Sequence, residues 1–294
     1  MPMQQATAEH VYQYVIGTAI VLLCVACVYP LTYVVALSLT SEKEWVESGG
    51  FLLWPTSPTL RAYVNVIVRT PVFTNSLMVS VARVVIGTPC ILLFTMTMGY
   101  ILSRQRLPGR QTLIVLVLIT ILFPGGLIPT YLVVAGLGLL NTFPVFFVPL
   151  LIDSWGVLVF KQFFGNTPRE IEEAAYIDGV GEVRLMVHIM IPMSTAVIAA
   201  WSLFIAVAQW NAWFDALIYV RNEYLMPLQL IMVNLFNTNL GWDMNFQTGE
   251  MVNRVSLMSL RMAITVLGTV PILLVYPFLQ KHFVSGVYLG SIKG

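Results

Sequence analysis

Four ionisable side chains lie inside strongly apolar stretches of the sequence, where an uncompensated charge is unfavourable. They are two cations and two anions: Arg83, Asp153, Asp215 and Arg261. An isolated charge at the centre of a bilayer costs about 2.5–3.5 kcal/mol even on insertion scales, so each should pair with another group or face water. Structural ion pairs and the lining of a substrate path both fit this pattern, and the sequence does not say which arginine meets which aspartate.

The stretch from Gln209 to Asp215, QWNAWFD, combines indole rings with amide and carboxylate groups. Indole faces can pack against sugar rings, and amides and carboxylates can bond hydroxyl groups. The residues expected along a substrate path are Trp210, Asn211, Trp213, Asp215, Arg83 and Asp153. Aromatic packing inside a helix bundle is equally open, because Trp210 and Trp213 share a helical stripe that Asp215 leaves.

Motifs for covalent catalysis or nucleotide binding are missing from the sequence. It contains neither a glycine-rich phosphate-binding loop nor a nucleophile elbow, and its three histidines are far apart. The cysteines Cys24, Cys27 and Cys90 lie in apolar runs, which indicates packing rather than a metal site or a disulfide. The chain is therefore expected not to be an enzyme, and energy for any work must come from another subunit or an ion gradient.

The composition is that of an integral membrane protein. The chain of 294 residues is 58% hydrophobic and 10% charged, with a mean hydropathy of +0.83. A soluble domain would carry about 25% charged residues. The net charge of +1 provides no basic face for nucleic acid.

Several apolar stretches reach the roughly 20 residues that a helix needs to cross a bilayer. The spans expected from the sequence are 12–39, 72–102, 113–134, 143–160, 185–220 and 255–279. The fifth is too long for one perpendicular span, and Pro192 marks an expected bend. Since no repeat or linker interrupts the chain, we expect an all-α membrane protein with six transmembrane helices in one domain, 1–294. Lys and Arg are more frequent in the loops on the side of both termini, which places the termini in the cytoplasm.

The loop between the fourth and fifth spans contains a well-signalled helix. Thr167 can act as the N-cap, Pro168 suits the first helical position, and Glu170 completes a capping box. Asp178 and Gly179 end the helix, because Gly179 can take a left-handed conformation. A surface helix that merely joins two spans and a docking element for another protein both fit this segment.

The same loop carries a longer pattern. It reads Glu173-Ala174-Ala175, three residues, Gly179, nine residues, and then Ile189-x-Ile191-Pro192. This pattern resembles the EAA loop of ATP-binding-cassette (ABC) importer permeases, with Ile191 in place of leucine as the one departure. Further stretches resemble sugar-importer permeases, in the branch that takes up complex or acidic oligosaccharides such as alginate: Asn75–Leu77, Tyr100–Arg104, Phe123–Tyr131, Leu137–Thr142 and Val275–Gly294.

This resemblance implies a type I ABC importer permease fold with a cytoplasmic coupling helix, in the bacterial inner membrane. It implies four partners: a second homologous permease, a homodimeric ABC ATPase, an extracytoplasmic solute-binding protein and membrane lipid. ATP and Mg would be held by the ATPase, and no cofactor by this chain. The coupling residues implied in the loop 166–184, in the bend after it and in the C-terminal tail are Glu173, Ala174, Ala175, Asp178, Gly179, Pro192, Gly290, Lys293 and Gly294.

An ion-coupled secondary carrier is the alternative, with Asp153 or Asp215 as the proton site. The EAA loop would have no purpose in such a carrier. An intramembrane enzyme ranks third, because no catalytic constellation supports it. The identity of the oligosaccharide, and which permease of the pair holds its binding site, are left open by the sequence.

Overall fold

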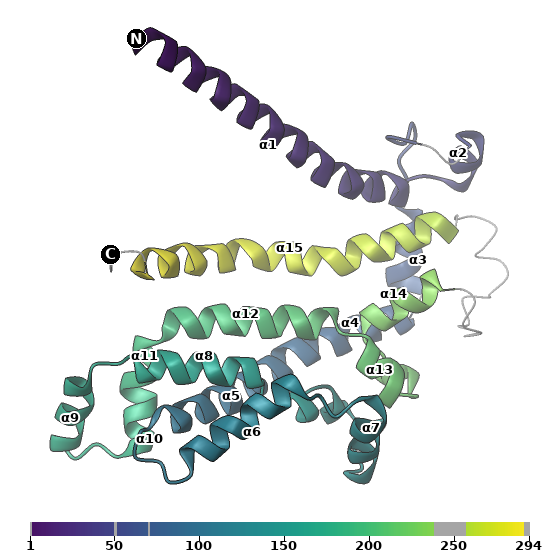
Figure 1. The fold of residues 1–294 in the computed structure, drawn as a ribbon. Coiled ribbons are helices and arrows are strands. Elements are labelled where there is room, and N and C mark those ends of the chain that lie inside the picture. Colours follow the sequence, from purple (N-terminus) through teal and green to yellow (C-terminus); the bar gives the residue numbers. More distant parts are fainter. Residues whose placement is uncertain (1, 50–51, 70, 238–256, 291–294) are drawn as a thin grey trace. The chain divides into compact units, whose positions relative to one another are not determined.

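The computed structural model describes residues 2–49, 52–69, 71–237 and 257–290, and the regular elements in these ranges are all helical (Figure 1). This confirms the expected all-α fold class. The α-helices are α1 (Pro2–Ser38), α2 (Glu42–Glu47), α3 (Arg61–Arg69), α4 (Pro71–Ala82), α5 (Thr88–Ser103), α6 (Arg110–Leu122), α7 (Leu127–Gly136), α8 (Ser154–Gly165), α9 (Arg169–Ile177), α10 (Glu182–Leu185), α11 (Ile191–Met193), α12 (Thr195–Asn211), α13 (Phe214–Tyr219), α14 (Leu228–Phe236) and α15 (Leu257–Gly290). Wider π-turns form η1 (Arg83–Gly87) and η4 (Met186–Met190), and 3-10 turns form η2 (Phe143–Phe146), η3 (Val148–Leu150) and η5 (Glu223–Leu225).

The chain divides into two compact units. The first comprises ranges 1–71 and 234–270, and the second comprises 72–233 and 271–294. In the first unit the Ser38 and Tyr63 hydroxyl oxygens lie 2.6 Å apart, and Ser259 donates to the Thr40 carbonyl at 2.8 Å. These bonds tie the end of α1 to α3 and α15.

Two helical stretches are long and apolar enough to cross a membrane unaided, Tyr12–Ser38 and Pro71–Ser103. Three more are pairs of helices bent at a short break: α6 with α7 by 118°, η2–η3 with α8 by 51°, and α10–α11 with α12 by 85°. The described residues thus give two spans, or up to five if each bent pair is one span, and the shorter apolar helix Met258–Leu274. Six spans remain a prediction.

Three expected spans differ from the helices that the structure contains. The stretch 143–160 begins as the 3-10 turns η2 and η3 and continues, after a bend of 51°, as α8 from Ser154 to Gly165. The stretch 113–134 is interrupted after Leu122, where Pro124 and two glycines follow, because proline cannot continue the helical hydrogen bonds. The stretch 185–220 bends at Ser194, two residues after Pro192, and α12 ends at Asn211.

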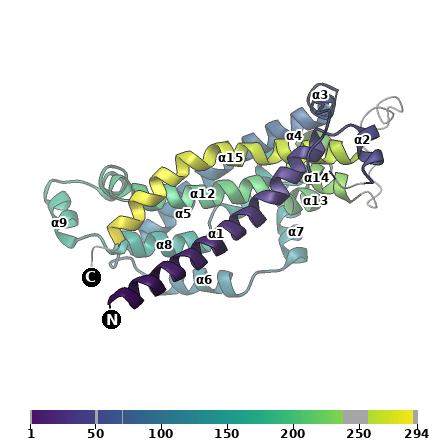
Figure 2. The ribbon, with the colours of Figure 1, turned by 90° about the horizontal axis from the view of Figure 1, so that it is seen from above.

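The second unit is built around α5, α8 and α12, which lie side by side in both views (Figures 1 and 2). Glycines allow the close approach of α8 to α5 and to the Trp201 side chain of α12. A Cβ atom added at Gly99 of α5 would lie 2.5 Å from the Cβ of Phe160, and one added at Gly156 of α8 would lie 2.3 Å from the indole nitrogen of Trp201. Small residues at such crossings let helix backbones pack closely in membranes.

Replacement of Gly156 by alanine is expected to destabilise the second unit. The new methyl group would push the Trp201 indole away from Asp153, whose Oδ2 atom accepts a hydrogen bond from that indole at 2.9 Å. Overpacking of this kind costs about 1–3 kcal/mol. Thermal unfolding in detergent would measure the loss. The matched control is Gly165→Ala at the end of the same helix, where a Cβ atom would meet nothing within 4 Å; equal melting of both variants would contradict the packing role of Gly156.

Candidate functional site

Helix α9 lies at one end of the second unit (Figure 1). It begins at Arg169, one residue later than expected, and Pro168 takes the N-cap position with an extended ψ of 134° and no side-chain cap bond. The expected capping box on Thr167 is therefore wrong. The reason is that Thr167 belongs to the preceding turn, since its amide donates to the Phe164 carbonyl of α8 at 3.3 Å.

The C-terminal end of α9 confirms the expectation for Gly179. Its φ is +74°, in the left-handed region that residues with a side chain rarely adopt. The Val180 amide donates to the Ala175 carbonyl at 2.9 Å, and the Gly179 amide donates to the Tyr176 carbonyl at 3.0 Å. This pair of bonds is a Schellman motif, which closes the helix and turns the chain sharply.

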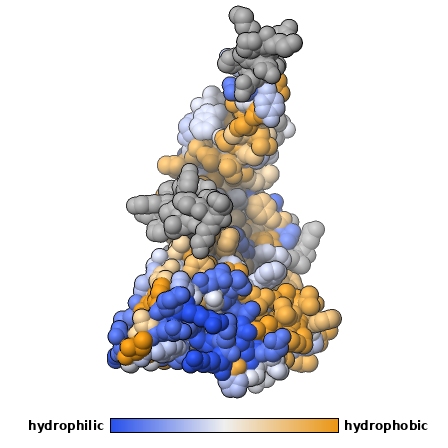
Figure 3. Space-filling model, turned by 60° about the vertical axis from the view of Figure 1, so that its left-hand side comes forward, coloured by the Kyte–Doolittle hydropathy of each residue, from blue (hydrophilic) through white to orange (hydrophobic). Residues whose placement is uncertain are grey.

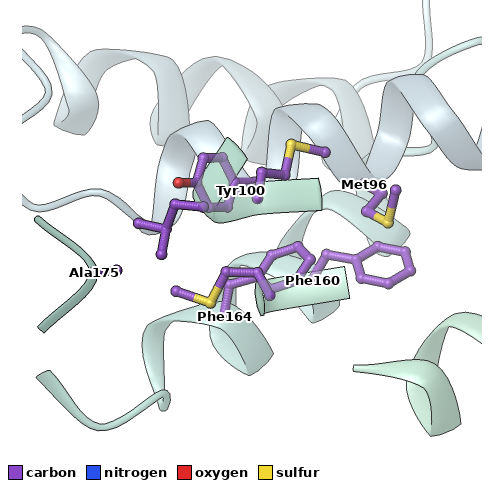
Figure 4. Packing of buried hydrophobic residues seen from close by; sticks show 8 residues of the cluster. Met96, Tyr100, Phe160, Phe164 and Ala175 are labelled. Carbon is purple, nitrogen blue, oxygen red and sulfur yellow. The ribbon is translucent and has the colours of Figure 1, made fainter. Parts of the chain in front are cut away.

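Helix α9 has one anchored face and one free face. Ala175 is buried with Phe160, Phe164 and Tyr100 in a cluster formed by α5, α8, α9, α10 and η4 (Figure 4). Glu173 and Ala174 are exposed, on the end of the unit where Figure 3 shows a hydrophilic patch. Of the two alanines expected to contact another protein, only Ala174 is available, because Ala175 anchors the helix to its own chain.

Polar side chains reinforce this anchor. The carboxylate of Glu182, the first residue of α10, accepts a hydrogen bond from Tyr100 of α5 at 2.7 Å and another from Tyr176 of α9 at 2.6 Å. Arg104 pairs with Glu172 of α9 at 2.7 Å, and its guanidinium carbon lies 4.3 Å from the centre of the Tyr100 ring. We call these five residues the polar clamp.

The clamp is formed with the tyrosines protonated. The hydrogen bond to Glu182, together with desolvation, raises the pKa of Tyr176 above its ordinary value. A tyrosine hydroxyl is already protonated at neutral pH, and the raised pKa of Tyr176 extends this donor state further into the alkaline range, so the Glu182 carboxylate can accept from both tyrosines at once.

Arg83 and Asp215 form an intramembrane ion pair within the second unit. The guanidinium of Arg83 is fully buried, donates to both carboxylate oxygens of Asp215, and lies 4.7 Å from the centre of the Phe146 ring. Its Nε atom donates to Gln209 at 2.6 Å. Such a bidentate arrangement satisfies most of the donors of a buried guanidinium.

The ion pair also secures a break in the helix. Helix α12 ends at Asn211 and α13 starts at Phe214, and Arg83 donates to the Ala212 carbonyl between them at 3.3 Å. The expectation that Trp210 and Trp213 share one helical stripe, which Asp215 leaves, therefore does not apply, because the helix stops between the two tryptophans. Trp210 is buried, Asn211 is exposed, and Trp213 packs edge-on against Phe214.

The other two intramembrane charges are stabilised differently. Asp153 is the N-cap of α8 and accepts from the Trp155 amide at 3.2 Å and from the Trp201 indole. In the first unit, the Arg261 guanidinium carbon lies 5.8 Å from the centre of the Phe236 ring. Within the described residues neither Asp153 nor Arg261 forms a salt bridge.

The remaining coupling candidates lie at several places. Asp178 is the exposed C-cap of α9, and Pro192 is exposed in α11 before the bend at Ser194. Gly290 is the last residue of α15, while Lys293 and Gly294 lie outside the described residues. No metal-binding group of His, Cys, Asp and Glu occurs in the part of the chain that the structure describes.

Several residues of these sites were not expected from the sequence. They are Tyr100, Arg104, Glu172, Glu182, Trp201 and Gln209. Gln209 begins the segment QWNAWFD, Tyr100 and Arg104 bound a stretch that resembles sugar-importer permeases, and Glu172 and Glu182 lie in the loop 166–184. Their pairings have no local signal, since Tyr100 and Glu182, for example, are 82 residues apart.

No protein-family model matches the chain. The chain is similar to Protein LplC of Bacillus subtilis, with 41% identity over 269 residues that cover 91% of this chain and 90% of the relative. It is also similar to the polygalacturonan/rhamnogalacturonan transport system permease protein YtcP of the same organism, with 39% identity over 268 residues, 91% of this chain and 93% of the relative.

A similar fold occurs in the crystal structure of a bacterial ABC transporter involved in the import of the acidic polysaccharide alginate. The TM-score is 0.85 at 25% identity, over 94% of this chain and 98% of that chain. The extent of these similarities confirms the resemblance seen in the EAA loop: the chain belongs to the binding-protein-dependent carbohydrate ABC transporter permeases, as a non-catalytic, multi-pass subunit of a sugar or oligosaccharide importer.

Proposed function

We propose that this chain forms one half of the translocation path of an ATP-driven importer of acidic oligosaccharides, and that α9 is its coupling helix. The observation that carries the proposal is the two-sided character of α9. Ala175 fastens one face to the core, while Glu173 and Ala174 on the other face are free to enter a partner. A helix of this kind can transmit the movement of a partner as a rigid body.

The partners follow from the same assignment. A homodimeric ATPase would bind ATP and Mg and hold α9, a second permease would complete the path, and an extracytoplasmic binding protein would deliver the sugar. Both termini and α9 would then face the cytoplasm, which agrees with the greater number of Lys and Arg in the loops on that side. Gly290, Lys293 and Gly294 would lie in a tail directed towards the ATPase.

The substrate class is supported by two of the similar proteins. Polygalacturonan and alginate are both polymers of sugar acids, and the proteins that resemble this chain are named for them. Arg83 is already neutralised by Asp215, so it would not offer a free charge to a substrate carboxylate. Trp213, Asn211 and Asp153 remain the proposed contacts along the path, through ring faces and hydrogen bonds to hydroxyls.

Transport by the complete complex tests this proposal. Proteoliposomes with the two permeases, the ATPase and the binding protein would be given labelled trigalacturonate, trimannuronate or maltotriose. We expect ATP-dependent uptake of one or both acidic trisaccharides and little uptake of the neutral one. Equal uptake of maltotriose would contradict the substrate class, and uptake by this chain alone, driven by a proton gradient without ATP, would contradict the ATP-driven mechanism.

A further inference from the structure

Only a short turn connects α9 to the apolar helices that follow it in the sequence. Helix α9 is nine residues long and is followed by a turn of only a few residues before α10 starts at Glu182. Gly179 and Gly181 lie in that turn, and neither would bring a Cβ atom within 4 Å of another atom. Val180 between them packs against the buried cluster, and a turn containing two glycines can absorb part of a displacement of α9 unless further contacts bridge it.

The carboxylate of Glu182 is such a bridge. Its Oε1 atom accepts from Tyr176 on α9, on one side of the turn, and its Oε2 atom accepts from Tyr100 on α5. The Tyr100 hydroxyl also lies 3.1 Å from the backbone oxygen of Glu182. One side chain therefore connects α9 and α10, on the two sides of the turn, to α5, which is distant in the sequence.

The Tyr100 end of this bridge is rigid. Its ring packs edge-on against Phe164 of α8 at a centroid distance of 5.8 Å, and Gly99 beside it leaves room for Phe160 of α8. The Phe160 and Trp201 rings continue this packing from α8 to α12. Movement that reaches Tyr100 is therefore shared by the three helices at the centre of the second unit.

We propose that Glu182 is a positioning residue for transport, which joins α9 to α5 so that a displacement of α9 reaches the membrane-embedded helices. This inference rests on the proposed function, in which α9 receives that displacement from the ATPase. Glu182 does not touch the substrate or the nucleotide; it determines how much of the movement of α9 arrives at the path. The pair of Arg104 and Glu172 holds the same two helices together at a second point.

The test measures uptake and ATP hydrolysis by the same reconstituted complex. In Glu182→Ala we expect hydrolysis stimulated by the binding protein to persist while the number of sugars taken up per ATP falls by more than about tenfold, because one hydrogen bond to a carboxylate is equivalent to roughly that factor and this variant loses two. Tyr176→Phe removes one bond only and should lower the ratio less. Tyr14→Phe, on an exposed residue of α1, is the matched control and should leave the ratio unchanged.

A double-mutant cycle shows whether the tyrosine acts through the carboxylate. Tyr176→Phe should have no further effect on the ratio when Glu182 is already alanine, since coupled residues are not additive. Three results would each overturn the role of Glu182. They are additive effects of the two substitutions, an unchanged ratio in Glu182→Ala, and a loss of uptake and hydrolysis in proportion to the amount of assembled complex. Uptake by the wild-type complex without ATP would instead overturn the proposed function, and that result is obtained before any variant is made.

Discussion

Replacement of Gly179 by valine is expected to reduce ATP-driven uptake at least about tenfold, while the protein still inserts in the membrane. Gly179 has a φ of +74°, and a β-branched residue in this region is a strong outlier. A left-handed residue with a side chain costs about 1–2 kcal/mol, and the turn would relax by breaking the Schellman bonds to Ala175 and Tyr176. The exposed face of α9 would then be misdirected relative to the ATPase.

Gly181 provides the matched control for this prediction. It lies in the same turn with equally open surroundings, but its φ of −77° and ψ of 163° suit any residue. Gly181→Val should therefore retain uptake, and Gly179→Asn should retain more than Gly179→Val, because asparagine tolerates the left-handed region. Uptake would be measured in vesicles at equal amounts of inserted protein. Normal uptake by Gly179→Val would mean that α9 is not the coupling helix.

Replacement of Arg83 by methionine is expected to destabilise the second unit by about 3–5 kcal/mol, the usual cost of removing one partner of a buried ion pair. The change leaves the carboxylate of Asp215 without its guanidinium partner and removes the donor from Gln209 and from the Ala212 carbonyl. Thermal unfolding of the purified protein in detergent would show the loss as a lower midpoint.

Removal of both charges distinguishes a structural ion pair from a functional one. Arg83→Met combined with Asp215→Leu should recover much of the stability, because a well-packed apolar pair often replaces a buried ion pair without loss. Arg106→Met, at an exposed arginine, should change the free energy of unfolding by less than about 0.5 kcal/mol. If Arg83→Met melts like the wild type, Arg83 is not needed for the fold. If the double variant is stable but does not transport, the pair has a role in the path itself.

The properties that could be predicted from sequence alone are those determined by residues that lie close together along the chain. Apolar stretches of sufficient length predicted a helical membrane protein, because the bilayer requires internal hydrogen bonding within each span. The EAA spacing located α9 and its neighbours, and Asp178 with Gly179 predicted its end, because only glycine takes a left-handed turn without strain. The local sequence also gave a wrong prediction, the capping box on Thr167. The backbone amide of Thr167 donates to the end of α8 instead, so Thr167 does not take the N-cap position of α9.

The tertiary structure alone decided which distant residues meet. Arg83 pairs with Asp215, 132 residues away, and Tyr100 meets Glu182, 82 residues away. The burial of Ala175 and the exposure of Ala174, adjacent in one motif, likewise depend on where Tyr100 and Phe164 lie. Helical periodicity limits the faces a residue can occupy, but the partner on that face is chosen by the packing of several helices at once, which no local stretch of sequence encodes.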